Sequence, residues 1–64
     1  MNKFELGNKV YIMNIPCVVK SVERRVHGWV YRVSHPTNKF YNIITWDEER
    51  LMSVADWQRE KGIV

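Results

Sequence analysis

The sequence is poor in the residues that mark disulfides, metal sites and phosphate-binding loops. It has one cysteine and two histidines, so no internal disulfide can form, and no C-x-x-C or H-x3-H spacing of a zinc site occurs. The three glycines stand apart from one another, and none belongs to a Gly-rich phosphate loop. We therefore expect no metal and no cofactor. Cys17 stands in the apolar stretch IPCVV, which is typical of a core thiol, and its solitary use favours a reducing compartment.

Long apolar runs are also missing. No stretch approaches the ~18–20 apolar residues of a membrane span, and the segment MNKFELGNK has no signal-peptide core. These absences favour a cytoplasmic protein that makes no membrane contact. A chain of 64 residues has room for one domain, residues 1–64, with one small core and no enclosed active-site cavity. Because neither Cys17 nor any serine lies in a nucleophile motif, we expect no enzymatic activity.

The net charge of +3 is unevenly distributed along the chain. Residues 1–46 carry seven basic and two acidic side chains, whereas residues 47–64 carry three basic and five acidic ones. A basic body followed by an acidic tail suits a polyanionic partner, but the tail could equally fold back on the body. The acidic run at 47–49 is typical of a solvated turn after a strand rather than of a general acid–base pair.

Short runs of β-branched and aromatic residues between turn residues predict strands. The second run loses strict alternation near Lys20–Ser21, which indicates a bulge, and His27–Gly28 is typical of a hairpin tip. Proline at position 16 should separate the first two strands, because it cannot donate to a central ladder. The four expected strands cover residues 9–13, 17–26, 29–34 and 40–46.

The last twenty residues mix helical and strand signals. Thr45 with Glu48 fits a capping box, and Gly62 fits a helix C-cap. Charged residues interrupt the apolar stripe of a single long helix. We expect a short helical turn at 47–50, then Leu51 in the core, a brief fifth strand at 52–54 and one or two helical turns within 55–61.

The segments ELGNKVYI, PCVVKSV, WVYRVS and YNIITWDEERLMSV together resemble the SH3-like barrel pattern. The resemblance covers about residues 5–54 and is shared with Tudor-type, KOW-type and small bacterial or phage proteins. It implies an all-β fold: a small five-stranded SH3-like barrel, closed or half-closed, with residues 55–64 as a partly helical tail. The chain departs from the KOW-type pattern at Cys17, where a glycine is usual, and it lacks the ALYDY-like loop of peptide-binding SH3 domains.

The resemblance implies a non-catalytic binding module, an accessory protein-interaction factor of bacterial, phage or plasmid origin, acting as a monomer or weak homodimer. A protein partner would contact Trp57, with Arg59 beside it, because no expected strand buries this tryptophan. The alternative for Trp57 is packing over an open end of the barrel.

A nucleic-acid-binding barrel is the second hypothesis. Small barrels bind single strands by stacking bases on aromatic rings while basic side chains follow the phosphates. The alternative is that Trp29 and Tyr31 point into the core and the basic residues line an ordinary solvated hairpin. The candidate nucleic-acid residues are Lys20, Arg24, Arg25, Trp29, Arg32, Lys39 and Tyr41.

Overall fold

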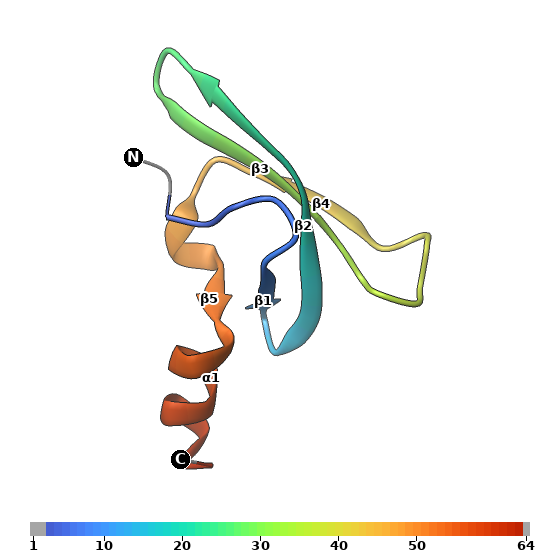
Figure 1. Cartoon of the computed structure of the whole chain (residues 1–64), viewed down its shortest axis with the longest axis vertical. Helices are drawn as coiled ribbons and strands as arrows, with labels where there is room; N and C mark the ends of the chain where they lie inside the picture. Colours follow the sequence, from blue (N-terminus) through green and yellow to red (C-terminus); the bar gives the residue numbers. More distant parts are fainter. Residues whose placement is uncertain (1–2, 64) are drawn as a thin grey trace.

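The computed structural model describes residues 3–63 and consists mainly of β-strands (Figure 1). A single short α-helix follows the last strand. In chain order the elements are β1 (Lys9–Ile12), β2 (Ile15–Arg25), β3 (Gly28–Ser34), β4 (Asn42–Thr45), the 3-10 turn η1 (Glu48–Arg50), β5 (Met52–Ser53) and α1 (Val54–Lys61).

The five strands form one antiparallel sheet in the order β4-β3-β2-β1-β5. This sheet is open, with β4 at one edge and β5 at the other, so the expected barrel closure is not confirmed. The short length of the outer strands explains the opening, because β5 has two residues and pairs with β1, while the four residues of β4 pair with β3. The expected succession of five strands along the chain, the helical turn before β5 and the terminal helical turns are confirmed.

The turn between β1 and β2 has two residues, Met13 and Asn14, both with positive φ (50° and 68°). Positive φ at both central positions defines a type I′ turn, whose twist matches that of the flanking strands. The proline expected to separate the strands lies inside β2, opposite Tyr11. In antiparallel pairing the hydrogen-bonded pair Ile12–Ile15 alternates with a non-bonded pair, so the nitrogen of Pro16 points away from β1 and no ladder bond is lost.

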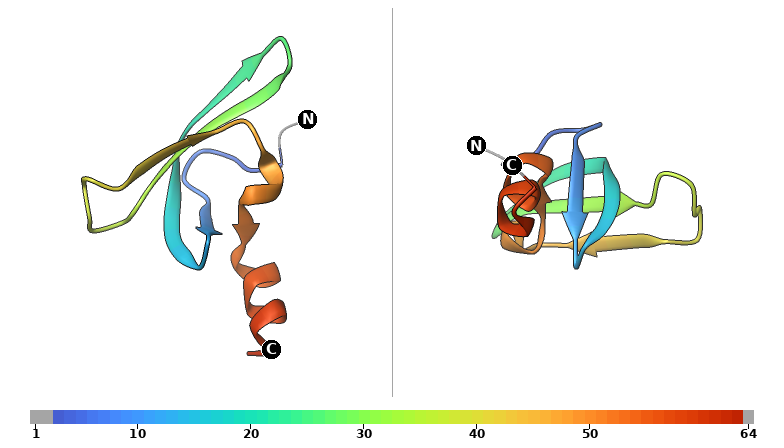
Figure 2. Two further views of the ribbon diagram at one scale, coloured as in Figure 1. Left: turned by 180° about the vertical axis from the view of Figure 1, so that it is seen from behind. Right: turned by 90° about the horizontal axis from the view of Figure 1, so that it is seen from below.

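β2 is the longest strand and bends so that its two halves have different partners (Figures 1 and 2). Its first half pairs with β1 and its second half pairs with β3. The pairing register with β3 shifts between Val19 and Ser21, which confirms the bulge predicted at Lys20–Ser21. The β2–β3 hairpin turns at Val26 and His27, one residue earlier than the predicted tip at His27–Gly28, because Gly28 already pairs with Arg25. Gly28, with φ of 133°, is the first residue of β3.

The core lies on the concave side of the bent sheet. Its side chains come from the chain before β1, from β1, β2 and β3, and from the residue after η1. Leu51 is buried there as expected, and Tyr31 is completely buried. The core cluster comprises Phe4, Val10, Ile12, Cys17, Val19, Tyr31, Val33 and Leu51.

A polar contact inside this core joins β3, η1 and the N-terminal segment. The hydroxyl of Tyr31 donates to Oε2 of Glu48 and accepts from the backbone N–H of Lys3 (3.1 Å) and of Phe4 (3.4 Å). The predicted capping box is therefore wrong, because Glu48 does not reach back to Thr45. Asp47 caps η1 instead, with its Oδ1 accepting from the backbone N–H of Glu49 (2.9 Å).

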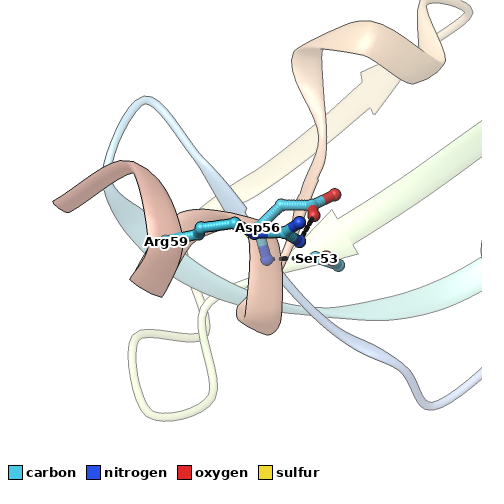
Figure 3. A network of polar contacts seen from close by, with 3 residues as sticks. All are labelled: Ser53, Asp56 and Arg59. Carbon is cyan, nitrogen blue, oxygen red and sulfur yellow. Dashed lines mark hydrogen bonds and ion pairs between the residues drawn. The ribbon is translucent and has the colours of Figure 1, made fainter. Parts of the chain in front are cut away.

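Ser53 and Gly62 cap the two ends of α1. The Ser53 hydroxyl accepts from the backbone N–H of Asp56 (3.1 Å), and the Asp56 carboxylate pairs with Arg59 one turn later (Figure 3). Gly62 has φ of 75° and its N–H bonds the carbonyl of Arg59, which confirms the predicted C-cap. The helix projects from the β1–β5 edge, away from the rest of the sheet (Figures 1 and 2).

Candidate binding face

The face of β2, β3 and β4 that points away from the core carries a mixed apolar and basic surface, which we call the outer face. The alternation of side chains along each strand, and the pairing between strands, determine which residues belong to the outer face, because residues opposite each other lie on the same face. Ser21 lies opposite Arg32, and Arg32 in turn lies opposite Ile44. The outer face comprises Ser21, Glu23, Arg25, Val30, Arg32, Ile44 and Trp46.

Two large apolar side chains on the outer face are open to solvent. Ile44 is 64% exposed and Trp46 is 55% exposed. Beside them, an open hollow of about 320 Å³ is lined by all the outer-face residues except Trp46. Exposed apolar groups rimmed by polar ones mark binding surfaces in soluble proteins. The outer face therefore combines apolar area with a recess that a partner side chain could enter.

The charges of the outer face are partly paired. Arg25 forms an ion pair with Glu23 at 3.0 Å, and its guanidinium lies 6.0 Å from the centre of the Trp46 ring. Both side chains of the ion pair are at least half exposed, so the pair contributes little to stability. Arg32 makes no ion pair within residues 3–63. The face thus offers one cation without a protein partner and a second that an acidic ligand could share.

The structure does not bring the seven candidate nucleic-acid residues together. Arg25 and Arg32 lie on the outer face, whereas Arg24 lies opposite Trp29 on the other side of the hairpin, with its guanidinium 5.6 Å from the ring centre. Trp29 packs partly against the core, as the alternative interpretation of this strand expected. The hairpin tip therefore divides its basic residues between two faces.

The remaining candidates lie elsewhere. Lys39 and Tyr41 belong to the β3–β4 connection, at the opposite end of β3 from the hairpin tip (Figure 1). The Tyr41 ring meets His35 edge-on at 6.4 Å and is half-buried against the core. Lys20 is exposed at the bulge of β2.

Trp57, the candidate protein anchor, packs within the chain. Its ring stacks on Tyr11 with centres 4.1 Å apart, and its Nε1 donates to Oδ1 of Asn14 (3.1 Å). The Trp57 ring therefore packs against the sheet, as the alternative to partner binding expected. Part of the ring stays accessible beside a hollow of about 190 Å³. Arg59 is exposed and pairs with Asp56.

Val30, Ile44 and Trp46 were not predicted as site residues from the sequence. A signal for Ile44 existed, because a strand reading NIIT places its two isoleucines on opposite faces and only one can face a core. No sequence pattern predicted the exposure of Trp46, since the face on which its side chain lies depends on where β4 ends and η1 begins.

Three further observations concern chemistry and location. Burial raises the pKa of the Cys17 thiol, which keeps it protonated. Within residues 3–63, no three His, Cys, Asp or Glu side chains are grouped as ligands of a metal ion would be. The helices among these residues are too short and too polar to cross a lipid bilayer.

Comparisons with protein families, with curated proteins and with solved structures found no match to this chain.

Proposed function

We propose that this chain is a non-catalytic protein-binding module whose outer face holds an acidic, partly apolar segment of a larger protein. The observation that carries the proposal is the joint exposure of Ile44 and Trp46 beside Arg32, on a strand face that the protein's own core does not use. Aromatic and arginine side chains are enriched at protein interfaces, where they contribute most of the binding energy.

An acidic partner follows from the charge of the face. The guanidinium of Arg32 is available for a carboxylate, and Arg25 could exchange Glu23 for an external one. The apolar part of the partner would lie on Ile44 and Trp46. A positively charged partner would be repelled by Arg32 and by Arg25, of which only Arg25 is offset by Glu23.

Nucleic-acid binding is the second candidate, and the observation that favours it is the pair of arginine–tryptophan contacts near the hairpin tip. Such a surface could stack bases and hold phosphates. It is less well supported, because the two pairs lie on opposite faces and Glu23 offsets part of the charge.

The wider assignment is part of the same proposal. The strand order, the 3-10 turn between β4 and β5 and the bent β2 support placing the chain with SH3-like proteins as an opened variant. An accessory role in the cytoplasm of a bacterium, or of a phage or plasmid host, follows from that resemblance.

Selection from a random peptide library tests the proposal. We expect the selected peptides to be rich in Asp or Glu next to apolar residues, and Arg32→Glu to weaken their binding at least about tenfold. Arg59→Glu, a charge reversal of the same size on α1, is the matched control and should leave binding unchanged. Peptides without acidic residues, or equal losses in both variants, would reject the outer face as the site.

A single-stranded oligonucleotide serves as the second arm of this test. Binding that Arg24→Ala and Arg25→Ala each weaken, with a steep dependence on salt, would replace the protein-binding proposal by the nucleic-acid one.

A further inference from the structure

β4 forms an open and unprotected edge of the sheet. It is the terminal strand on its side and pairs with β3 alone in the ladder. Exposed edges normally carry a charged residue, a proline or a bulge that prevents another strand from adding to them. The sequence of β4, NIIT, has neither charge nor proline, and its register with β3 is regular.

The backbone groups that face outward on this edge can be identified. The N–H of His35 donates to the carbonyl of Tyr41 (3.1 Å), which marks a hydrogen-bonded pair between β3 and the start of β4. Because bonded and non-bonded pairs alternate along antiparallel strands, the backbone groups of Ile43 and Thr45 also face β3. Those of Asn42 and Ile44 therefore point away from the sheet.

The segments that flank β4 are complementary to each other. Lys39 and Phe40 precede the strand, and Trp46 and Asp47 follow it. Phe40 is 85% exposed, an unusual state for a phenylalanine, and Trp46 is more than half exposed. Each end of β4 thus carries one exposed aromatic ring and one charge, and the two charges are opposite.

We propose that two copies of this chain associate through β4, antiparallel and related by a two-fold axis near Ile43. In this register Asn42 lies opposite Ile44 of the partner subunit, so that the outward backbone groups of both strands are satisfied. The same axis brings Phe40 toward Trp46 of the partner subunit and Lys39 toward Asp47 of the partner subunit. The two sheets become continuous, and their outer faces lie side by side.

A second copy fits this edge better than an unrelated strand does. A two-fold interface requires a surface that is complementary to itself. The segment around β4 has this property, because Lys39 and Phe40 precede the uncharged strand and Trp46 and Asp47 follow it. An edge of four residues is short, so the dimer should be weak and in exchange with the monomer.

Sedimentation equilibrium from about 10 µM to about 1 mM tests the association. We expect the average mass to rise from the 7.7 kDa of one chain toward twice that value. Asn42→Pro removes an outward N–H without touching a β3–β4 bond, and it should keep the protein monomeric. A monomer throughout the range, or a folded Asn42→Pro variant that still dimerises, would overturn the proposal.

Amide hydrogen exchange on the unaltered protein locates the interface and decides the matter if Asn42→Pro fails to fold. The amides of Asn42 and Ile44 should exchange at least about tenfold more slowly at the high concentration, whereas the buried amide of Ile43 should change far less. Dimerisation without slower exchange at Asn42 and Ile44 would place the interface elsewhere and overturn the proposal.

Charge reversal gives an independent check. Lys39→Glu should weaken the dimer, because it places two acidic side chains opposite each other. Asp47→Asn, which keeps the side-chain oxygen that caps η1, removes the other charge and should weaken the dimer less. Arg59→Glu, far from β4, is the control. A dimer that is equally strong in Lys39→Glu would contradict the register.

This inference is separate from the proposed function. Asn42→Pro leaves the side chains of Arg32, Ile44 and Trp46 in place, so it should abolish the dimer and still bind the selected acidic peptides. Loss of peptide binding in Arg32→Glu without loss of the dimer would show the reverse separation.

Discussion

At the scale of single residues, the hydroxyl of Tyr31 connects three parts of the chain that are distant in sequence. The hydroxyl contacts Glu48 and the backbone of Lys3 and Phe4. The Tyr31 side chain itself is fully buried. A buried hydrogen-bonded group is costly to disrupt, because the partners that remain lose their bonds without regaining water.

We expect Tyr31→Phe to lower the free energy of unfolding by about 1–3 kcal/mol. The ring still fills its place, so the loss reports the hydroxyl alone. Tyr41→Phe is the matched control, since the Tyr41 hydroxyl makes no hydrogen bond within residues 3–63, and it should change stability by less than about 0.5 kcal/mol. Urea unfolding measures both, and equal values for the two variants would contradict the role of Tyr31.

The same contact should make stability depend on pH in the acid range. The hydrogen bond from Tyr31, followed by that from the backbone of Lys3, lowers the pKa of Glu48 in the folded state. A lowered folded pKa contributes stability that is fully present above the unfolded value of about 4.3 and is lost as the pH falls through the folded pKa.

Unfolding curves of the protein and of Glu48→Gln between about pH 7 and pH 2.5 measure this contribution. The unaltered protein should be the more stable at neutral pH, and the difference should shrink below about pH 4.3. A difference that stays constant, or grows on acidification, would contradict the assignment.

At the scale of elements, the β1–β2 turn holds a residue poorly suited to its conformation. Met13 has φ of 50° and an exposed side chain, whereas type I′ turns favour Asn, Asp or Gly at this position. Met13→Asn should therefore raise the free energy of unfolding by about 1 kcal/mol. The control is Met52→Asn in the strand β5, where asparagine is disfavoured and stability should fall. A destabilised Met13→Asn variant would show that the methionine side chain matters more than the turn.

The attachment of α1 to the sheet depends on Trp57, which stacks on Tyr11 and donates a hydrogen bond to Asn14. An isolated helix of eight residues is unstable in water, so the stack of Trp57 on Tyr11 must hold it. Trp57→Ala should remove about 0.5–1.5 kcal/mol of stacking energy and increase amide exchange throughout α1 while the core of the sheet stays protected. Arg59→Ala, which removes an exposed side chain from the same helix, should change little. Unaltered exchange in α1 after Trp57→Ala would mean that its caps alone are sufficient.

At the scale of the whole molecule, local sequence patterns predicted the strands and helical segments well, but they did not predict whether the sheet closes into a barrel. Alternation and turn residues located β1, β3, the bulge and both helical segments, because these depend on neighbours in sequence. Whether β4 and β5 meet depends on how far β2 bends and how long the outer strands are, which no local pattern contains. The prediction that Pro16 ends a strand was wrong, because a proline costs a ladder hydrogen bond only where its nitrogen faces a neighbouring strand. The nitrogen of Pro16 points away from β1.

For the candidate site, too, the sequence predicted some of the residues but not their arrangement in space. Arg25 and Arg32 were recognised from their charge, but charge does not tell on which face of a twisted hairpin a residue lies. The two-residue turn at Val26–His27 sets that register and separates Arg24 from Arg25. Ile44 and Trp46 are exposed because they lie on the side of β4 that points away from the core, and that side depends on the register of β4 with β3.

We propose that this protein binds its partner through the outer face, and not through the hairpin tip or α1. NMR titration of the isotopically labelled protein with an acidic peptide from the library, and separately with a single-stranded oligonucleotide, distinguishes these sites. We expect peptide-induced shifts at Arg25, Val30, Arg32, Ile44 and Trp46, and oligonucleotide shifts that vanish at about 0.15 M salt. Peptide shifts centred on Trp57, or saturable oligonucleotide binding at that salt through Arg24 and Trp29, would contradict it.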